Sequence, residues 1–171
     1  MINEIMTDIK NPASRSKNMA AIKNRNTKPE LFVRKALFAD GFRYRITPTD
    51  IPGHPDIYLP KYNIAIFIHG CFWHRHSGCR FAYSPKSNSE FWENKFKRNV
   101  LRDSEVRACL RAKGIRYLIV WECAIKASQK RTGNIRDFLH HIEEIIRSEV
   151  MEAEVEANED FKTWWNNPDC F

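Results

Sequence analysis

The residues with the clearest potential for chemistry lie in one short segment, HGCFWHRHSGC, at positions 69–79. Its cysteines and histidines include Cys71, His76 and Cys79, and the distant Cys123 could join them. Three thiolates and one imidazole are the ligand types that Zn²⁺ takes in closed structural sites. We therefore predict a zinc site that stabilises this loop. Buried free thiols beside incidental histidines are the alternative.

A carboxylate and an imidazole are expected to meet at the end of a nearby hairpin. Asp56 follows a Pro/Gly-rich loop and begins a strand. A turn centred between residues 61 and 62 places Asp56 opposite Phe67, and His69 then points to the same face. A register shift of one residue would send His69 to the other face. In the predicted register, Asp56 could hold Mg²⁺ and His69 could activate water; turn capping and a structural histidine are the alternative.

Three aromatic side chains could form a wedge that enters DNA. Phe72 and Trp73 lie inside the cysteine- and histidine-rich loop, where exposure is expected, and Trp92 lies near the start of a long helix. An aromatic wedge can unstack a base step, and a mismatch lowers the cost of doing so. For Trp92, packing against the core is the alternative, since that is the usual place of a helix aromatic.

An alternation of helices and strands must position these residues. Capping residues and glycine stops predict helices over residues 27–40 and 87–113, and a final helix is expected over residues 135–147. Apolar and alternating runs predict strands over residues 42–46, 56–59, 64–68 and 115–121. A helical crossover usually joins parallel neighbours, so the expected fold is α/β, with a mixed sheet flanked by helices.

Charge is divided unequally along the chain. Residues 1–147 carry 27 basic and 14 acidic residues, whereas residues 148–171 carry seven acidic residues and one lysine. A basic body suits a polyanion, although a merely soluble surface is the alternative. We expect a basic N-terminal arm over residues 1–26 that would contact a polyanion such as DNA, one folded domain over residues 27–147 and an acidic tail over residues 148–171. The tail either folds back on the basic body or stays mobile.

Composition excludes disordered and membrane-spanning classes. Hydrophobic residues make up 43% of the chain and aromatic residues 12%, which are globular values. The clearest apolar run, residues 64–68, is far shorter than the roughly 20 residues of a membrane span. The N-terminus lacks the pattern of a signal peptide. We therefore expect a cytoplasmic protein without a membrane partner.

Five segments resemble the very short patch repair endonucleases, which act on T:G mismatches. They are RSKNM (15–19), PGHPD (52–56), HGCFWH (69–74), EFW (90–92) and VWEC (120–123). The resemblance implies a restriction-endonuclease-like core in which Phe67-Ile68-His69 replaces the superfamily's acidic-x-lysine motif. It also implies a Mg²⁺-dependent nick 5′ of the thymine in a T:G mismatch left by deamination of 5-methylcytosine.

The same resemblance implies roles for residues of the active site. Asp56 is similar to the family's magnesium ligand, with the backbone carbonyl of Ile68 beside it, and His69 to its active-site histidine. Glu30 resembles an acidic residue that reaches metal-bound water, while a capping-box role on its own helix stays open. The two remaining catalytic candidates are His74, near the scissile phosphate, and Asp103 as its partner.

The resemblance also covers the zinc set and the residues that would intercalate into DNA. These residues are Cys71, His76, Cys79, Cys123, Phe72, Trp73, Trp92 and, on the N-terminal arm, Met19. The chain departs from the family pattern at three places: Ile68 where threonine is expected, His54 where arginine is expected, and a loop of altered composition before Cys79. The ligand types survive these changes.

The expected partner is double-stranded DNA with a T:G mismatch, with other repair proteins as further candidates. An asymmetric mismatch does not require a two-fold enzyme, so we expect a monomer. Two other functions stay open. One is a zinc-stabilised DNA-binding module without catalysis, and the other is a restriction-type nuclease of the same fold that cuts fully paired DNA.

Overall fold

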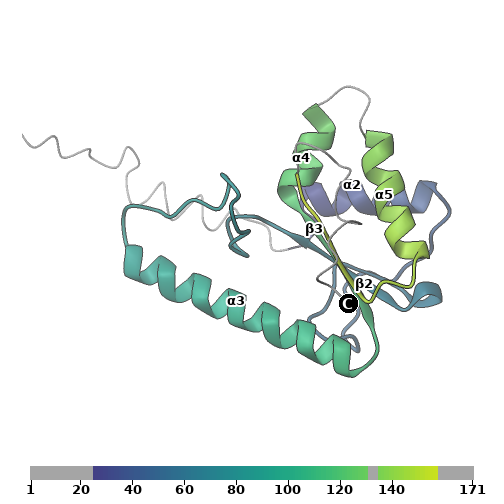
Figure 1. The fold of residues 1–171 in the computed structure, drawn as a ribbon, viewed down its shortest axis with the longest axis horizontal. Coiled ribbons are helices and arrows are strands. Elements are labelled where there is room, and N and C mark those ends of the chain that lie inside the picture. Colours follow the sequence, from purple (N-terminus) through teal and green to yellow (C-terminus); the bar gives the residue numbers. More distant parts are fainter. Residues whose placement is uncertain (1–24, 131–134, 158–171) are drawn as a thin grey trace, which may run out of the picture.

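Helices lie on both faces of one mixed sheet in the computed structural model, which describes residues 25–130 and 135–157 (Figure 1). The strands are β1 (Ile57–Leu59), β2 (Ile64–His69), β3 (Arg116–Trp121) and β4 (Glu152–Val155), in that order across the sheet. β1 and β2 are antiparallel, whereas β2, β3 and β4 are mutually parallel. The predicted α/β class with a mixed sheet is confirmed.

The hairpin that carries Asp56 has the predicted register. Ile57 pairs with Ile66, which brings the preceding Asp56 opposite Phe67. A 3-10 turn over Pro60–Tyr62 links the two strands. His69 is the last residue of β2, and it shares a face with Phe67 because successive strand side chains alternate.

Capping chemistry sets the start of the first described helix, whereas the residue before the second, Asn88, makes no side-chain cap. α2 (Lys28–Ala39) starts after Thr27, whose hydroxyl accepts from the backbone N–H of Glu30. The long helix α3 (Ser89–Ala112) begins two residues later than predicted, and Gly114 follows it with a φ of 62° that favours glycine. α5 (Ile135–Arg147) matches the predicted range.

Three elements differ from the sequence prediction. The predicted strand over residues 42–46 is wrong: the segment makes only one isolated bridge, between Arg45 and Tyr58. A short helix that the sequence did not suggest, α4 (Glu122–Lys130), follows β3 directly. β4 lies in the segment predicted as an acidic tail, so residues 148–157 fold back on the basic body.

The two faces of the sheet are covered unequally. α2, α4 and α5 pack on one face around a large apolar cluster that includes Leu37, Ile125, Phe138 and Ile142. The other face is covered by α3, in which only Phe96 and Leu110 are buried. Most of α3 is therefore free to line a cleft or to meet a partner. No helix in the described part of the chain is long and apolar enough to span a membrane.

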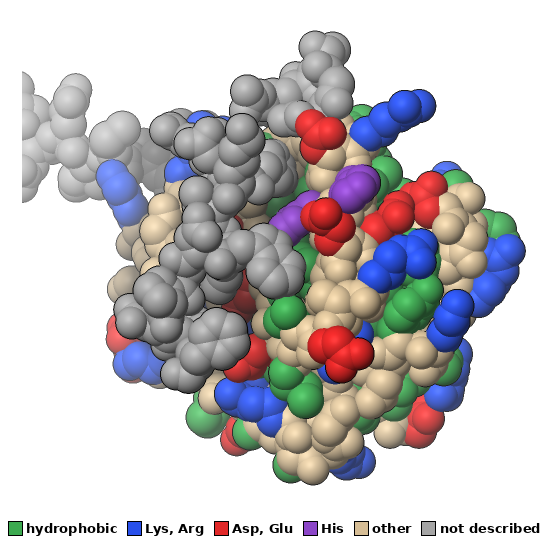
Figure 2. All heavy atoms as spheres, turned by 45° about the vertical axis from the view of Figure 1, so that its right-hand side comes forward, with side chains coloured by type: hydrophobic (Ala, Val, Ile, Leu, Met, Phe, Trp, Pro, Cys, Tyr) green, Lys and Arg blue, Asp and Glu red, His purple; other side chains and the backbone are tan. Residues whose placement is uncertain are grey.

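The outer surface on the side of α2, α4 and α5 mixes charges of both signs. Lys and Arg side chains alternate there with Asp and Glu side chains, without a broad patch of one sign (Figure 2). A polyanion gains little from such a surface, because attraction and repulsion offset each other. The concave side of the molecule, between β2 and α3, is the better place to look for a functional site.

Candidate functional site

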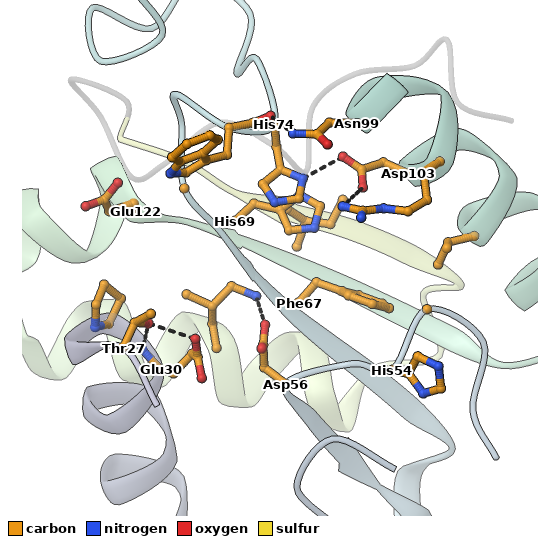
Figure 3. A pocket seen from close by; sticks show the side chains of 18 of the residues that line it. Thr27, Glu30, His54, Asp56, Phe67, His69, His74, Asn99, Asp103 and Glu122 are labelled. Carbon is orange, nitrogen blue, oxygen red and sulfur yellow. Dashed lines mark hydrogen bonds and ion pairs between the residues drawn. The ribbon is translucent and has the colours of Figure 1, made fainter. Parts of the chain in front are cut away.

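A cleft of about 770 Å³ opens where the end of β2, the loop after it and α3 meet (Figure 3). Four separate segments of the chain contribute predicted site residues to its lining. These residues are Glu30, Asp56, Ile68, His69, Trp73, His74 and Asp103. In Figure 3 the carboxylates of Glu30 and Asp56 lie on one side of the cleft, and the two histidines with Asp103 lie on the other.

The carboxylate of Asp56 is held at the start of the hairpin by the opposite strand. Its Oδ2 accepts a hydrogen bond of 2.7 Å from the backbone N–H of Ile68. Burial raises the pKa of Asp56 to about 6, although this hydrogen bond and the nearby Arg34 and His74 oppose the rise. A bound cation would relieve the same desolvation, so the site suits a divalent ion that prefers carboxylate oxygen.

The raised pKa predicts a pH-dependent effect of Asp56→Asn on stability. The carboxyl has a pKa of about 6 in the folded protein, against an ordinary value of 3.8, so the folded state holds this proton more tightly than the unfolded state does. The stability that the protonated carboxyl contributes at low pH is therefore lost as the pH rises through 6. Asparagine removes this charge at nearly constant volume. We expect the variant to gain on the order of 2–3 kcal/mol of unfolding free energy at pH 8 without divalent cations, and little near pH 3.

Urea unfolding of the two proteins at pH 3 and pH 8, in chelator, measures this effect. Asp50→Asn is the matched control, because Asp50 is exposed and pairs with Arg45 at 2.6 Å. The control should gain nothing at pH 8. A wild-type protein as stable as Asp56→Asn at pH 8 would show that the Asp56 carboxylate is not penalised by burial.

Glu30 combines a structural role with a place in the cleft. Its carboxylate accepts from the backbone of Asn26 at 2.8 Å, from the hydroxyl of Thr27 at 2.8 Å and from Arg34 at 3.1 Å. The start of α2 therefore has the capping box expected from Thr27 and Glu30, except that Glu30 reaches back to the backbone N–H of Asn26 instead of that of Thr27. Arg34 also donates to the backbone carbonyl of Asp56 at 3.2 Å, which links α2 to the start of β1. Capping and exposure to the cleft are compatible.

Two stacked histidines form the opposite wall. The ring centres of His69 and His74 lie 3.7 Å apart, and the angle between the ring planes is 10°. Nδ1 of His74 donates to Oδ2 of Asp103 at 2.6 Å, which leaves its Nε2 free to accept a proton. Desolvation, aided by the neighbouring His74, lowers the pKa of His69 well below its ordinary value, so His69 is neutral at physiological pH. The ring of His69 also makes a T-shaped contact with Trp121, with the two ring centres 5.4 Å apart.

His69 also has an unused polar atom. Among the described residues, its buried Nδ1 has no hydrogen-bond partner. A buried polar atom without a partner costs free energy, and such groups are kept mainly where a ligand or water completes them. The position of His69 in the wall of the cleft therefore favours a bound group there.

A second cluster lies beside the cleft and fits a closed metal site. The ligand atoms of Cys71, His76, Cys79 and Cys123 all lie within 4.8 Å of one another. Nδ1 of His76 is 3.7 Å from Sγ of Cys71 and 3.4 Å from Sγ of Cys123. Ordinary Zn–S and Zn–N bonds in a tetrahedral site separate such atoms by about 3.6 Å. A hydrogen bond from the Cys71 thiol lowers the pKa of Cys123 and raises the pKa of Cys71, so the two sulfurs share a proton that a metal would displace.

The aromatic residues predicted to form a wedge lie together, and one of them, Trp73, lines the cleft. The ring centre of Phe72 lies 5.0 Å from that of Trp73 and 5.4 Å from that of Trp92, and all three side chains are partly exposed. Trp92 also stacks on the buried Phe96, so part of its surface does pack inward. Nζ of Lys95 lies 5.1 Å from the ring centre of Trp73. Met19 and the predicted arm, up to residue 24, lie outside the described residues.

Several lining residues were not singled out from the sequence. Lys95, Asn99, Arg102 and Arg107 line the cleft from α3, and the side chain of Asn99 donates to the backbone carbonyl of Trp73 at 2.9 Å. Lys95, Asn99 and Arg102 are four and three residues apart, which places them on one side of the predicted helix. That spacing, together with Asp103, was the available signal.

Comparison with known proteins gives consistent matches. The sequence matches the family model described as DNA mismatch endonuclease Vsr over residues 7–80, a range that contains Asp56, His69 and His74. It is 38% identical over 152 residues to the DNA mismatch endonuclease Vsr of Escherichia coli (strain K12), which covers 89% of this chain and 96% of that protein. It is 41% identical over 135 residues to the Type II nicking enzyme V.XorIIP of Xanthomonas oryzae pv. oryzae, covering 77% of this chain and 98% of the relative. The Type II nicking enzyme V.NmeAIP of Neisseria meningitidis serogroup A is 46% identical over 121 residues, or 71% and 86% of the two chains.

Proposed function

The chain belongs to the DNA mismatch endonuclease Vsr family and is a DNA endonuclease, and we propose that it nicks one strand of a duplex 5′ of the thymine in a T:G mismatch. The mismatch would arise by deamination of 5-methylcytosine. Relatives named as nicking enzymes support cleavage of a single strand. The observation that supports this function best is the cleft itself, where a buried carboxylate with a raised pKa faces two stacked histidines.

Asp56 is the proposed ligand of a catalytic Mg²⁺, with the backbone carbonyl of Ile68 nearby and Glu30 holding water at the site. The ion would polarise the scissile phosphate and lower the pKa of attacking water. Burial of Asp56 supports this assignment, since the unfavourable desolvation of the carboxylate is relieved by a cation. The hydrogen bond from Ile68 to Asp56 fixes the carboxylate before a substrate arrives.

His74 is the proposed general base. The hydrogen bond from its Nδ1 to Asp103 fixes the tautomer, exposes Nε2 to the cleft and stabilises the imidazolium that forms when Nε2 takes a proton from water. The pair thus resembles other histidine–carboxylate pairs in hydrolases. His69 is kept neutral by burial, so it serves as a hydrogen-bonding group that positions water or a phosphate oxygen.

The proposed DNA-binding surface surrounds the cleft. Lys95 and Arg102 on α3 supply positive charge toward phosphates, and Phe72, Trp73 and Trp92 supply the wedge at the mismatch. Met19 and the basic arm over residues 1–26 are proposed to insert from the minor-groove side. The cluster of Cys71, His76, Cys79 and Cys123 is proposed to bind a structural Zn²⁺ that holds the wedge loop in place.

We also assign the core to the restriction-endonuclease-like fold, with an endonuclease domain that extends beyond the predicted range of 27–147 to include β4. Support comes from a mixed sheet in which an antiparallel hairpin carries the carboxylate and α3 crosses over to a parallel third strand. Phe67-Ile68-His69 lies on β2 in place of an acidic-x-lysine motif. A cytoplasmic monomer that works with other repair proteins is the proposed setting.

The decisive experiment compares labelled duplexes that differ only in one base pair. A T:G duplex and its paired T:A twin, in several flanking sequence contexts, are incubated with the protein in Mg²⁺ or in EDTA. We expect Mg²⁺-dependent nicking of the thymine strand of the T:G duplex alone. Equal cleavage of both duplexes would favour a restriction-type nuclease, and tight binding without cleavage in any context would favour a DNA-binding module.

A further inference from the structure

The C-terminal strand β4 leads into a carboxylate that reaches the cysteine and histidine cluster. Oε2 of Glu156, the residue after β4, lies 2.5 Å from Nε2 of His76. His76 is 8% exposed and Glu156 is 28% exposed, so the contact is largely shielded from water. We propose that Glu156 is a positioning residue of the metal centre, which orients His76 so that Nδ1 faces the cysteine sulfurs.

The contact fixes which nitrogen of His76 can bind a metal. An ionised carboxylate accepts hydrogen bonds and donates none, so the imidazole proton lies on Nε2. The lone pair then lies on Nδ1, the atom that is 3.4 Å from Cys123 and 3.7 Å from Cys71. Histidines that bind metals commonly donate their other N–H to a carboxylate in this way, which sets the tautomer and raises the basicity of the ligand atom.

A second contact fixes the plane of the same ring. His76 stacks on Trp121 with ring centres 4.1 Å apart at 8°. Trp121 is itself held, because its indole N–H donates to Glu154 at 2.8 Å. Glu154 and Glu156 therefore act on the same imidazole, one through Trp121 and one directly. Rotation of His76 about its side-chain bonds is opposed from two directions.

The strand pattern explains how Glu156 reaches this place. Glu152, Glu154 and Glu156 alternate along the chain, so they point to one face of the sheet. Glu152 accepts a hydrogen bond from the hydroxyl of Tyr117 and forms an ion pair with Arg111. Glu154 accepts a hydrogen bond of 2.8 Å from Arg107. β4 is parallel to β3 with Val120 opposite Val155, so the next residue, Glu156, arrives beside Trp121. Each of the three glutamates thus has its own partners on the face of the sheet that bears the metal centre.

Glu156→Gln tests the proposal, because the amide keeps the size of the side chain and removes its charge. Loss of such a carboxylate partner commonly weakens metal binding by about 10–100-fold. Full-length proteins are stripped of metal, and Zn²⁺ affinity is measured by competition with a chromophoric chelator. Co²⁺ absorption follows the number of thiolate ligands in each variant. These readouts do not involve nicking, so they stand apart from the proposed reaction.

Glu152→Gln is the matched control, since it makes the same change on the same face of β4 and contacts Tyr117 and Arg111 instead. We expect Glu156→Gln to bind Zn²⁺ about 10–100-fold more weakly, Glu152→Gln to bind it as the wild type does, and Glu156→Asp to recover part of the loss. Equal affinity of Glu156→Gln and wild type would overturn the proposal, as would an equal loss in both glutamine variants.

A measurement on the wild-type protein keeps the proposal testable if the variant fails to fold. Long-range ¹H–¹⁵N correlation spectra of the Zn²⁺-loaded protein report which nitrogen of His76 carries the proton. We expect the proton on Nε2 and the metal on Nδ1. Metal on Nε2 would contradict the proposed role of Glu156, because that nitrogen could not then donate to the carboxylate.

Discussion

Asp56→Asn is expected to lower the rate of nicking by about 10³-fold or more while leaving binding to the mismatched duplex nearly unchanged. The asparagine carbonyl can still accept the hydrogen bond from Ile68, but a neutral amide is a poor ligand for Mg²⁺. Loss of the ion removes several kcal/mol of transition-state stabilisation, and each 1.4 kcal/mol corresponds to about a tenfold change in rate. The same variant is expected to be more stable than the wild type at pH 8 without divalent cations, so unfolding could not explain the loss.

Single-turnover nicking of the T:G duplex, measured across a range of Mg²⁺ concentrations, tests this effect. Duplex binding in Ca²⁺ or EDTA gives the affinity separately. The exposed Asp50 again provides the control, and Asp50→Asn should nick at the wild-type rate. Near-normal nicking by Asp56→Asn in saturating Mg²⁺ would show that Asp56 is not the ligand of the catalytic Mg²⁺.

His74→Ala should lower the nicking rate by about 10²–10⁴-fold, the usual contribution of a general base. Asp103→Asn should lower the rate as well, because the amide no longer favours the tautomer with the proton on Nδ1 and no longer stabilises the imidazolium. Since the two residues act as one unit, the double variant should be no slower than His74→Ala alone. Single-turnover rates of the four proteins measure the coupling.

His54→Ala is the matched control for these variants. His54 also lines the cleft, but its Nδ1 lies 3.4 Å from the carbonyl of Pro48, away from the stacked pair. Its removal should change the rate far less than removal of His74. Additive losses in the double variant would show that Asp103 does not act through His74. A loss in His54→Ala as large as that in His74→Ala would show that the effect is not specific to the proposed general base.

Local chemistry explains which parts of the fold the sequence predicted well. The capping box of Thr27 and Glu30, the glycine after α3 and the turn at residues 60–63 are decided by neighbouring residues. The hairpin register follows from the position of that turn, and the register alone puts Asp56 and His69 on one face of the sheet. The α5 range follows from its apolar face.

The errors arise where distant residues decide the outcome. Residues 42–45 do alternate between buried or half-buried and exposed, as in a strand, but β1 is only three residues long and offers one bridge at Arg45. The segment around β4 resembles an acidic tail, because its alternating glutamates point to one face and nothing in the local sequence shows their partners. Arg107, Trp121 and His76 become their partners only after the sheet forms.

The candidate site shows the same division. Residue types and spacing pointed to Asp56, His69 and the cysteine–histidine cluster, and the family resemblance pointed to His74; the structure brings Asp56 and both histidines into one cleft. The stacking of His69 on His74 and the rise in the pKa of Asp56 depend on burial in the assembled cleft. Polar side chains of α3 such as Asn99 were missed because a polar helix face usually meets only solvent.

The separation of the contacting residues along the chain has a consequence for the order of assembly. His76 meets Cys123 across 47 residues and Glu156 across 80 residues. Contacts between such distant residues form late, since a long loop must close before they are made. A chain emerging from the ribosome therefore carries Asp56 and both histidines well before β4 can stabilise the wall behind them. Until β4 has been synthesised, Arg107, Trp121 and His76 lack the contacts with Glu154 and Glu156 that hold them in the folded protein.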